Sequence, residues 1–150
     1  MGYNKFEELD AYYRSHAKPI LWVKHWANNA ADPCISQLIS LLGFEGYGRF
    51  WRLVELASND PTHEIPYSGK QGYKGFVLGL QFSDSEAFEG FISTLIDLDL
   101  AFISEEGKRF ISIVETAARD YGLRMVDGAK GGNKASANRK RKQGNNENSY

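Results

Sequence analysis

The chain has 150 residues, of which 42% are hydrophobic and 13% aromatic, enough for the core of one domain with an appendage. No apolar run approaches the ~20 residues that a membrane span needs, and residues 1–14 lack the apolar stretch of a signal peptide. Cys34 is the single cysteine, which excludes an internal disulfide and fits a reducing compartment. Together these features predict a cytoplasmic protein with no membrane partner.

The net charge of −1 conceals an uneven distribution along the chain. Residues 1–123 hold 11 Lys and Arg against 17 Asp and Glu, a net of −6, whereas residues 124–150 hold 7 against 2, a net of +5. Beyond Asp127 the sequence is rich in Gly, Asn, Lys and Arg and nearly devoid of apolar residues. Such a segment cannot bury enough surface to offset its ordering entropy. We therefore predict a domain over residues 1–126 and a disordered basic tail over residues 127–150.

The first half of the chain predicts helices. Residues 4–16 read as a short helix that carries Phe6, Leu9 and Tyr13 on one face, and residues 20–23 read as a strand.

A second helix starts at Asp32-Pro33, because Asp caps free backbone N–H groups and Pro fits the first helical position. Gly43 is a natural C-terminal stop. A further apolar stripe follows at helical spacing and includes Tyr47, Phe50 and Trp51. Amphipathic helices bury such a stripe, so we expect these three aromatic residues in the core.

The second half predicts two helices followed by a hairpin. Residues 70–80 form a helix interrupted by glycines, and Ser83 with Glu86 matches a capping box that starts a helix over residues 84–98. The period then changes from helix to strand, and two strands with a turn at residues 105–108 span residues 101–113. This order predicts an α+β, mainly helical fold. It is that of a winged helix-turn-helix with a C-terminal β-hairpin wing, in which helix 84–98 would face the DNA major groove.

One stretch of the sequence is informative beyond its secondary-structure pattern. It contains Trp22-Val23-Lys24-His25, Asn28-Asn29, Asp32-Pro33 and Gly46-Tyr47-Gly48-Arg49-Phe50-Trp51. The arrangement resembles the N-terminal domain of phage and prophage replisome organisers, the DnaD-like replication initiators, over roughly residues 20–115. Lys130-Gly131-Gly132 and the basic run after it are similar to the tails of that family. The resemblance implies DNA binding at a replication origin and contacts with helicase-loading proteins as partners.

The candidate DNA-binding residues are all basic. Lys70 and Lys74 lie on the first helix of the helix-turn-helix and Lys108 and Arg109 lie near the hairpin tip, both suitable places for phosphate contacts. The tail adds six cations that can release counterions from phosphates: Lys130, Lys134, Arg139, Lys140, Arg141 and Lys142. The competing interpretation is ordinary surface charge and a solvated tail without a partner.

Two other functions stay open. The helix at 84–98 has no Lys or Arg and carries acidic residues that would repel phosphates, namely Asp84, Glu86, Glu89 and Asp97. This favours a protein-interaction module without DNA contact, a class that includes a phage inhibitor of a host protein. An exposed Trp22 or Trp26 would point the same way. A transcription regulator shares the fold, and fold does not settle function.

The sequence offers no support for an enzyme, a cofactor or a metal. His16, His25, His63 and Cys34 are too scattered to match a zinc spacing. The glycines at 69, 72 and 75 are not followed by Gly-Lys-Ser/Thr, so a P-loop is not indicated. We find no pattern that assembles a nucleophile, a base and an oxyanion site.

Overall fold

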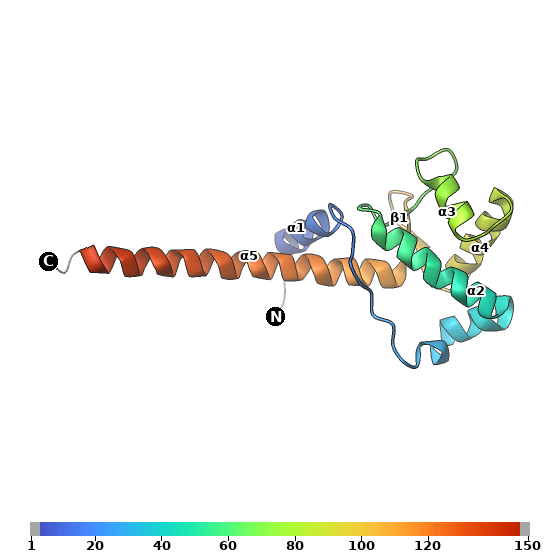
Figure 1. Ribbon diagram of the computed structural model, residues 1–150, viewed down its shortest axis with the longest axis horizontal. Helices are drawn as coiled ribbons and strands as arrows, with labels where there is room; N and C mark the ends of the chain where they lie inside the picture. Colours follow the sequence, from blue (N-terminus) through green and yellow to red (C-terminus); the bar gives the residue numbers. More distant parts are fainter. Residues whose placement is uncertain (1–3, 148–150) are drawn as a thin grey trace.

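The structure is a computed structural model that describes the backbone of residues 4–147, and their side chains except at 133 and 141–147. The described chain is mainly helical, with one small antiparallel sheet of three strands in the order β1-β3-β2. This confirms the predicted α+β class. A compact body holds the sheet and most helices, and the last helix projects from it as a rod (Figure 1). Among the described residues, no helix combines the length and apolar character needed to span a membrane.

Helix α1 (Lys5–Ser15) begins at a capping box between Asn4 and Glu7. The predicted helix is confirmed, but its predicted apolar face is not the packed one. Phe6, Leu9 and Tyr13 are exposed, whereas the small residues Ala11 and Ser15 are buried. Small side chains let α1 approach a neighbouring helix closely, so Ala11 and Ser15 form its packed face. The large apolar residues of α1 point to solvent instead.

Residues 17–28 form an extended strap that contributes no strand, so the strand predicted over residues 20–23 is wrong. The strap is held by Ile20, whose N–H donates to the carbonyl of Ser58 over 2.8 Å. Further on, the His25 ring stacks on Trp51 with 4.1 Å between ring centroids. A 3-10 turn, η1 (Asn29–Ala31), then leads into the next helix.

Helix α2 (Pro33–Asn59) is two helical segments joined at Gly43. Asp32 caps the start by accepting from the N–H groups of Cys34 and Ile35, as predicted. Gly43 adopts φ +68°, a conformation that favours glycine, and breaks the helix where a stop was predicted.

After α2 the chain forms one short strand, the two predicted helices and the two strands of the predicted hairpin. They are β1 (Glu64–Ile65), α3 (Tyr73–Gly79), α4 (Ser85–Asp97), β2 (Ala101–Ile103) and β3 (Arg109–Ile111). The α4 cap is Asp84, which accepts from the Ala87 N–H, so the capping box predicted at Ser83 lies one residue too early. β3 pairs with β1 on one side and with β2 on the other.

One hydrophobic core joins α2, α3, α4 and the sheet. The fully buried side chains include Phe50, Leu53, Phe88, Leu95 and Ile111. The buried face of α4 consists of Phe88, Phe91, Ile92 and Leu95, which are all in the core. Phe50 is likewise buried, while Tyr47 and Trp51 are partly buried and pack against the core.

Helix α5 (Ser112–Glu147) begins directly after β3 and continues through the predicted tail. The structure therefore corrects the disorder predicted from Asp127, because the backbone is helical as far as Glu147. A physical reason is that extending a helix already nucleated by packing is far easier than starting one. The packed half buries Val114, Ala118, Gly122 and Val126, four residues apart, and the residues beyond Val126 are exposed where their side chains are described.

Candidate nucleic-acid interface

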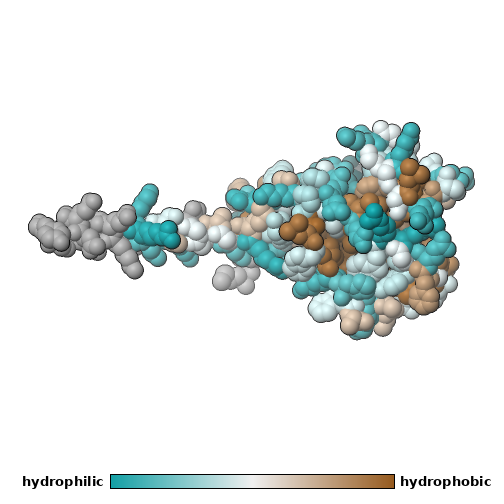
Figure 2. Space-filling model, viewed as in Figure 1, coloured by the Kyte–Doolittle hydropathy of each residue, from teal (hydrophilic) through white to brown (hydrophobic). Residues whose placement is uncertain are grey.

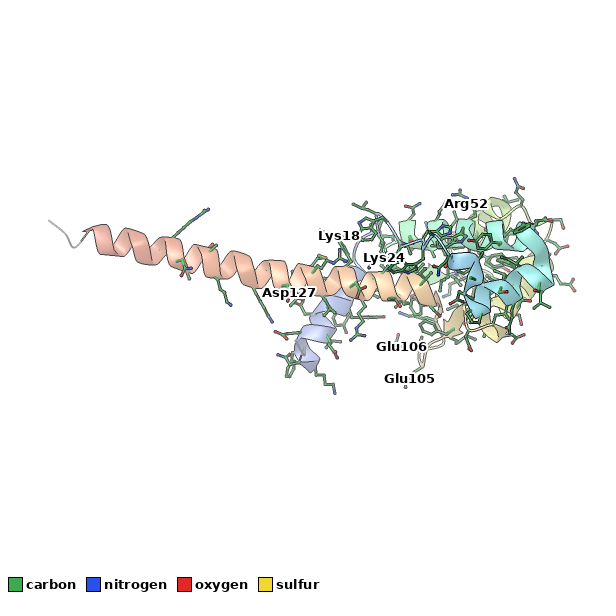
Figure 3. All side chains as sticks on the ribbon, turned by 90° about the horizontal axis from the view of Figure 1, so that it is seen from below. Lys18, Lys24, Arg52, Glu105, Glu106 and Asp127 are labelled. Atoms are coloured by element: carbon green, nitrogen blue, oxygen red, sulfur yellow. The ribbon has the colours of Figure 1, made fainter. Side chains whose placement is uncertain are left out.

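The projecting half of α5 carries most of the predicted tail cations. Lys134, Arg139 and Lys140 are exposed. The side chains of Arg141 and Lys142 lie outside the described residues. Figure 2 shows a largely hydrophilic surface along the described part of this rod, and Figure 3 shows its side chains standing clear of the body.

Lys130 differs from the other tail cations because it already has a partner. Its Nζ forms an ion pair with Glu7 of α1. The hydrogen bond from Lys130 and the one between Glu7 and the Asn4 backbone hold the pKa of Glu7 below its usual value. Lys130 thus links α1 to α5 and is less free to meet a phosphate than the residues beyond it.

Lys70 and Lys74 are exposed beside a groove on α3 that is also lined by Gly72, Tyr73 and Ser85. Within the described residues, no carboxylate forms an ion pair with either lysine. The two side chains therefore remain available to an external anion, and their contact with phosphates stays a prediction.

The hairpin tip is less basic than the sequence indicates. Lys108 Nζ lies 3.3 Å from a carboxylate oxygen of Glu64 and 3.4 Å from one of Glu106. The hydrogen bond to Glu64 is the main reason that the pKa of Lys108 lies above its usual value. Glu105 and Glu106 lie together at this turn (Figure 3). A phosphate at Lys108 would have to compete with these carboxylates.

Arg109 is a structural residue, which corrects its predicted place on the surface. Its side chain is 5% exposed. The guanidinium donates to Glu89 over 2.6 Å and to the carbonyl of Pro66 over 2.5 Å, and it stacks on the ring of Tyr67. The arginine joins α4, β3 and the residues after β1, so none of its charge faces solvent as a phosphate ligand would.

The ion pair with Arg109 also shows that part of the negative charge of α4 is used inside the protein. Glu89 is bound to Arg109 and also accepts from the Tyr73 hydroxyl over 2.8 Å. Asp84 is the helix cap. Two of the four acidic residues therefore have internal roles, and Glu86 and Asp97 remain on the surface.

The Gly-Tyr-Gly-Arg-Phe-Trp segment organises the neighbouring turn. Arg49 Nε donates to the carbonyl of Leu80 over 2.9 Å at the end of α3, and its guanidinium lies over the Phe82 ring at 4.2 Å. Gly46 is required by close packing, since a Cβ there would lie 2.3 Å from Cβ of Leu42. The Arg49 contacts therefore fix the turn between α3 and α4, and Gly46 allows close packing within α2.

The structure also reveals an aromatic groove that the spacing of residues did not predict. Trp22 and Trp26 are exposed, at 59% and 62% of their surface, and line a groove with Tyr121 and Arg124 of α5. The Arg124 guanidinium lies 5.6 Å from the Trp22 ring centroid. The sequence signal was the tryptophan pair itself, but only the fold shows that α5 completes the groove.

Two histidines that are distant in sequence meet at the C-terminal end of α1. His16, His63 and Glu115 each offer a ligand atom within 4.8 Å of the others. Burial opposes protonation of His16, but its hydrogen bonds to Glu115 and to the Tyr12 carbonyl outweigh this, so its pKa lies above the usual value. Burial lowers the pKa of His63.

Comparisons with protein-family models, with curated proteins and with solved structures find no match for the chain. The resemblance to DnaD-like replication initiators therefore stays a prediction based on the motifs of residues 20–115.

Proposed function

We propose that the protein is a DNA-binding module of the winged-helix type that serves replication initiation in a phage or prophage. The observation that carries the proposal is the projecting half of α5. Residues 131–146, beyond the ion pair of Lys130 with Glu7, contain five Lys and Arg and no Asp or Glu, on a helix that stands clear of the acidic body. A free basic rod can follow a phosphate backbone without bringing the body's negative charge close to it.

The body supports the same function more weakly. The order α3, α4, β2, β3 is that of a helix-turn-helix with a wing. Lys70 and Lys74 line a groove that reaches Ser85 at the start of α4, and they have no ion-pair partners among the described residues. We assign backbone contacts to these lysines and to Lys134, Arg139 and Lys140. Because α4 presents no cation, sequence-independent binding follows from this arrangement, and base reading by α4 is not part of the proposal.

The test is fluorescence anisotropy with random-sequence duplex and single-stranded DNA over a salt series. We expect the full chain to bind, and the triple variant Lys134→Gln, Arg139→Gln, Lys140→Gln to bind more weakly. The slope of log K against log salt should fall by about 0.9 for each duplex phosphate that the variant no longer neutralises. A matched triple on the body, Lys5→Gln, Lys18→Gln, Lys24→Gln, should retain the slope. Equal weakening in both triples, or no binding at low salt, would contradict the proposal.

A second function is favoured by the aromatic groove. Trp and Arg dominate the energetic centres of protein interfaces, and Trp22, Trp26 and Arg124 are exposed together. In this alternative the groove binds a replication protein or another host protein. A partner that stays bound after nuclease treatment and is released on Trp26→Ala, with DNA binding unchanged, would support it.

A further inference from the structure

The strongest unassigned feature is the cluster of His16, His63 and Glu115, which joins three separate elements. His16 is the residue that ends α1, His63 lies in the turn before β1, and Glu115 lies in the first turn of α5. His16 Nε2 lies 3.2 Å from Glu115 Oε1, and the two imidazole rings are 4.9 Å apart between centroids. His63 is fully buried, and the side chains of His16 and Glu115 are 13% and 20% exposed.

The outer hydrogen bonds determine which ring nitrogens carry protons. His16 Nδ1 lies 2.8 Å from the carbonyl of Tyr12, and His63 Nε2 lies 3.0 Å from the carbonyl of Lys18. A carbonyl only accepts, so each ring donates an N–H there. In the neutral rings, the lone pairs are then on His16 Nε2 and His63 Nδ1, and the Glu115 carboxylate adds a third acceptor.

Within the described residues, His16 Nε2 and Glu115 Oε1 are paired in one hydrogen bond, whereas no group donates to His63 Nδ1. His63 Nδ1 is buried and has no hydrogen-bond partner in the described chain. A buried acceptor without a donor is costly. A cation held among the three groups would satisfy all of them.

We propose that His16, His63 and Glu115 bind a divalent transition-metal ion, with Zn²⁺ as the best match. Imidazole nitrogens with a carboxylate oxygen are ligands that Zn²⁺ accepts. Metal-binding histidines usually donate their other N–H to a carbonyl or carboxylate, as both rings do here. Adjacent ligands of a tetrahedral zinc stand roughly 3.3 Å apart. His16 Nε2 and Glu115 Oε1 already have this spacing, so only the wider separations in the cluster, which reach 4.8 Å, have to shorten on binding.

The ion reaches the cluster through an open groove lined by Tyr12, His16, Glu115 and Arg119. Three protein ligands leave a fourth position to water from this groove. The bound ion joins the end of α1 to the residues before β1 and to the start of α5. Its effect is to clamp α1 and the strap onto the body.

The experiment is calorimetric titration of ZnCl₂ into the tag-free, chelator-treated full chain, with thermal unfolding followed in parallel. We expect one ion per chain and an increase in Tm. Glu115→Gln, which keeps the side-chain volume, should weaken binding at least tenfold and abolish the increase in Tm. His16→Gln is the second variant and should act in the same way, should Glu115→Gln fail to fold.

Two control variants and a spectroscopic measurement show where the ion binds. Cys34→Ser and His25→Gln remove the remaining thiol and the remaining histidine, and both should bind zinc as the unmodified chain does. Visible absorption of Co²⁺ in place of Zn²⁺ should show the bands of a tetrahedral site, and these should vanish in Glu115→Gln. No binding by the full chain, or equal binding by folded Glu115→Gln and the full chain, would overturn the proposal.

Discussion

The two halves of α5 form one helix but are stabilised in different ways. The first half places Val114, Ala118, Gly122 and Val126 against α1 and the body, so its stability comes from tertiary packing. The second half has exposed side chains wherever they are described, and beyond the ion pair of Lys130 with Glu7 it depends on local helix propensity. Residues in the second half can therefore change with little effect on folding. This separation allows a binding surface to vary while the body keeps its core.

The largest expected effect tests the packed region. Phe88→Ala removes a fully buried ring of α4 and should lower the free energy of unfolding by about 3–5 kcal/mol. Phe6→Ala removes a ring that is 84% exposed on α1 and should change it by less than about 0.5 kcal/mol. Chemical denaturation of both variants measures the difference. Equal decreases would mean that α1 packs through Phe6 and not through Ala11.

An intermediate effect separates the two halves of α5 directly. At Gly122 an added Cβ would lie 2.2 Å from the carbonyl oxygen of Ala11, so Gly122→Ala should push α1 away and cost about 1–3 kcal/mol. At Gly128 an added Cβ meets nothing within 4 Å, so Gly128→Ala should stabilise the helix by up to about 1 kcal/mol. Thermal unfolding checks the opposite signs. A rise in stability from Gly122→Ala would exclude this close approach of α1 and α5.

The smallest expected effect on stability is at the boundary between the two halves of α5. Lys130→Met breaks the ion pair with Glu7 and should lower Tm slightly at pH 7. The folded pKa of Glu7 is lowered, so the stabilisation is complete above the usual pKa of Glu and is lost as pH falls through the folded value. The difference between variant and unmodified chain should therefore disappear in acid.

The matched control is Lys134→Met, one helical turn further on. It changes the same side chain at a position without an ion pair among the described residues, and should leave Tm unchanged at both pH values. A decrease in Tm that persisted in acid, or one equal in the two variants, would assign the effect to helix propensity instead of the ion pair.

Local signals predicted the starts and stops of helices well. Asp32-Pro33 and Gly43 bound a segment through hydrogen bonds and backbone angles that neighbouring residues determine. The apolar spacing of α4 likewise places Phe88 in the core, because a strongly amphipathic helix has one face to bury.

What the sequence did not predict depends on contacts between distant residues. The packed face of α1 is set by Gly122, more than 100 positions away, so the periodicity of Phe6, Leu9 and Tyr13 indicated the wrong face. Arg109 follows a turn and reads as exposed, but Glu89 and the Pro66 carbonyl enclose it. His16 and His63 show no metal spacing, because the fold alone brings them to Glu115.

The long α5 also affects how the protein moves in solution. Its 36 residues span about 54 Å, and much of that length extends beyond the body of a 16.9 kDa chain. A particle of this shape experiences more friction than a sphere of the same mass. A single copy should then elute early from a gel-filtration column, in the volume of a larger globular protein. Oligomeric state is therefore to be judged from light-scattering mass, because elution volume alone would suggest a dimer for a monomer.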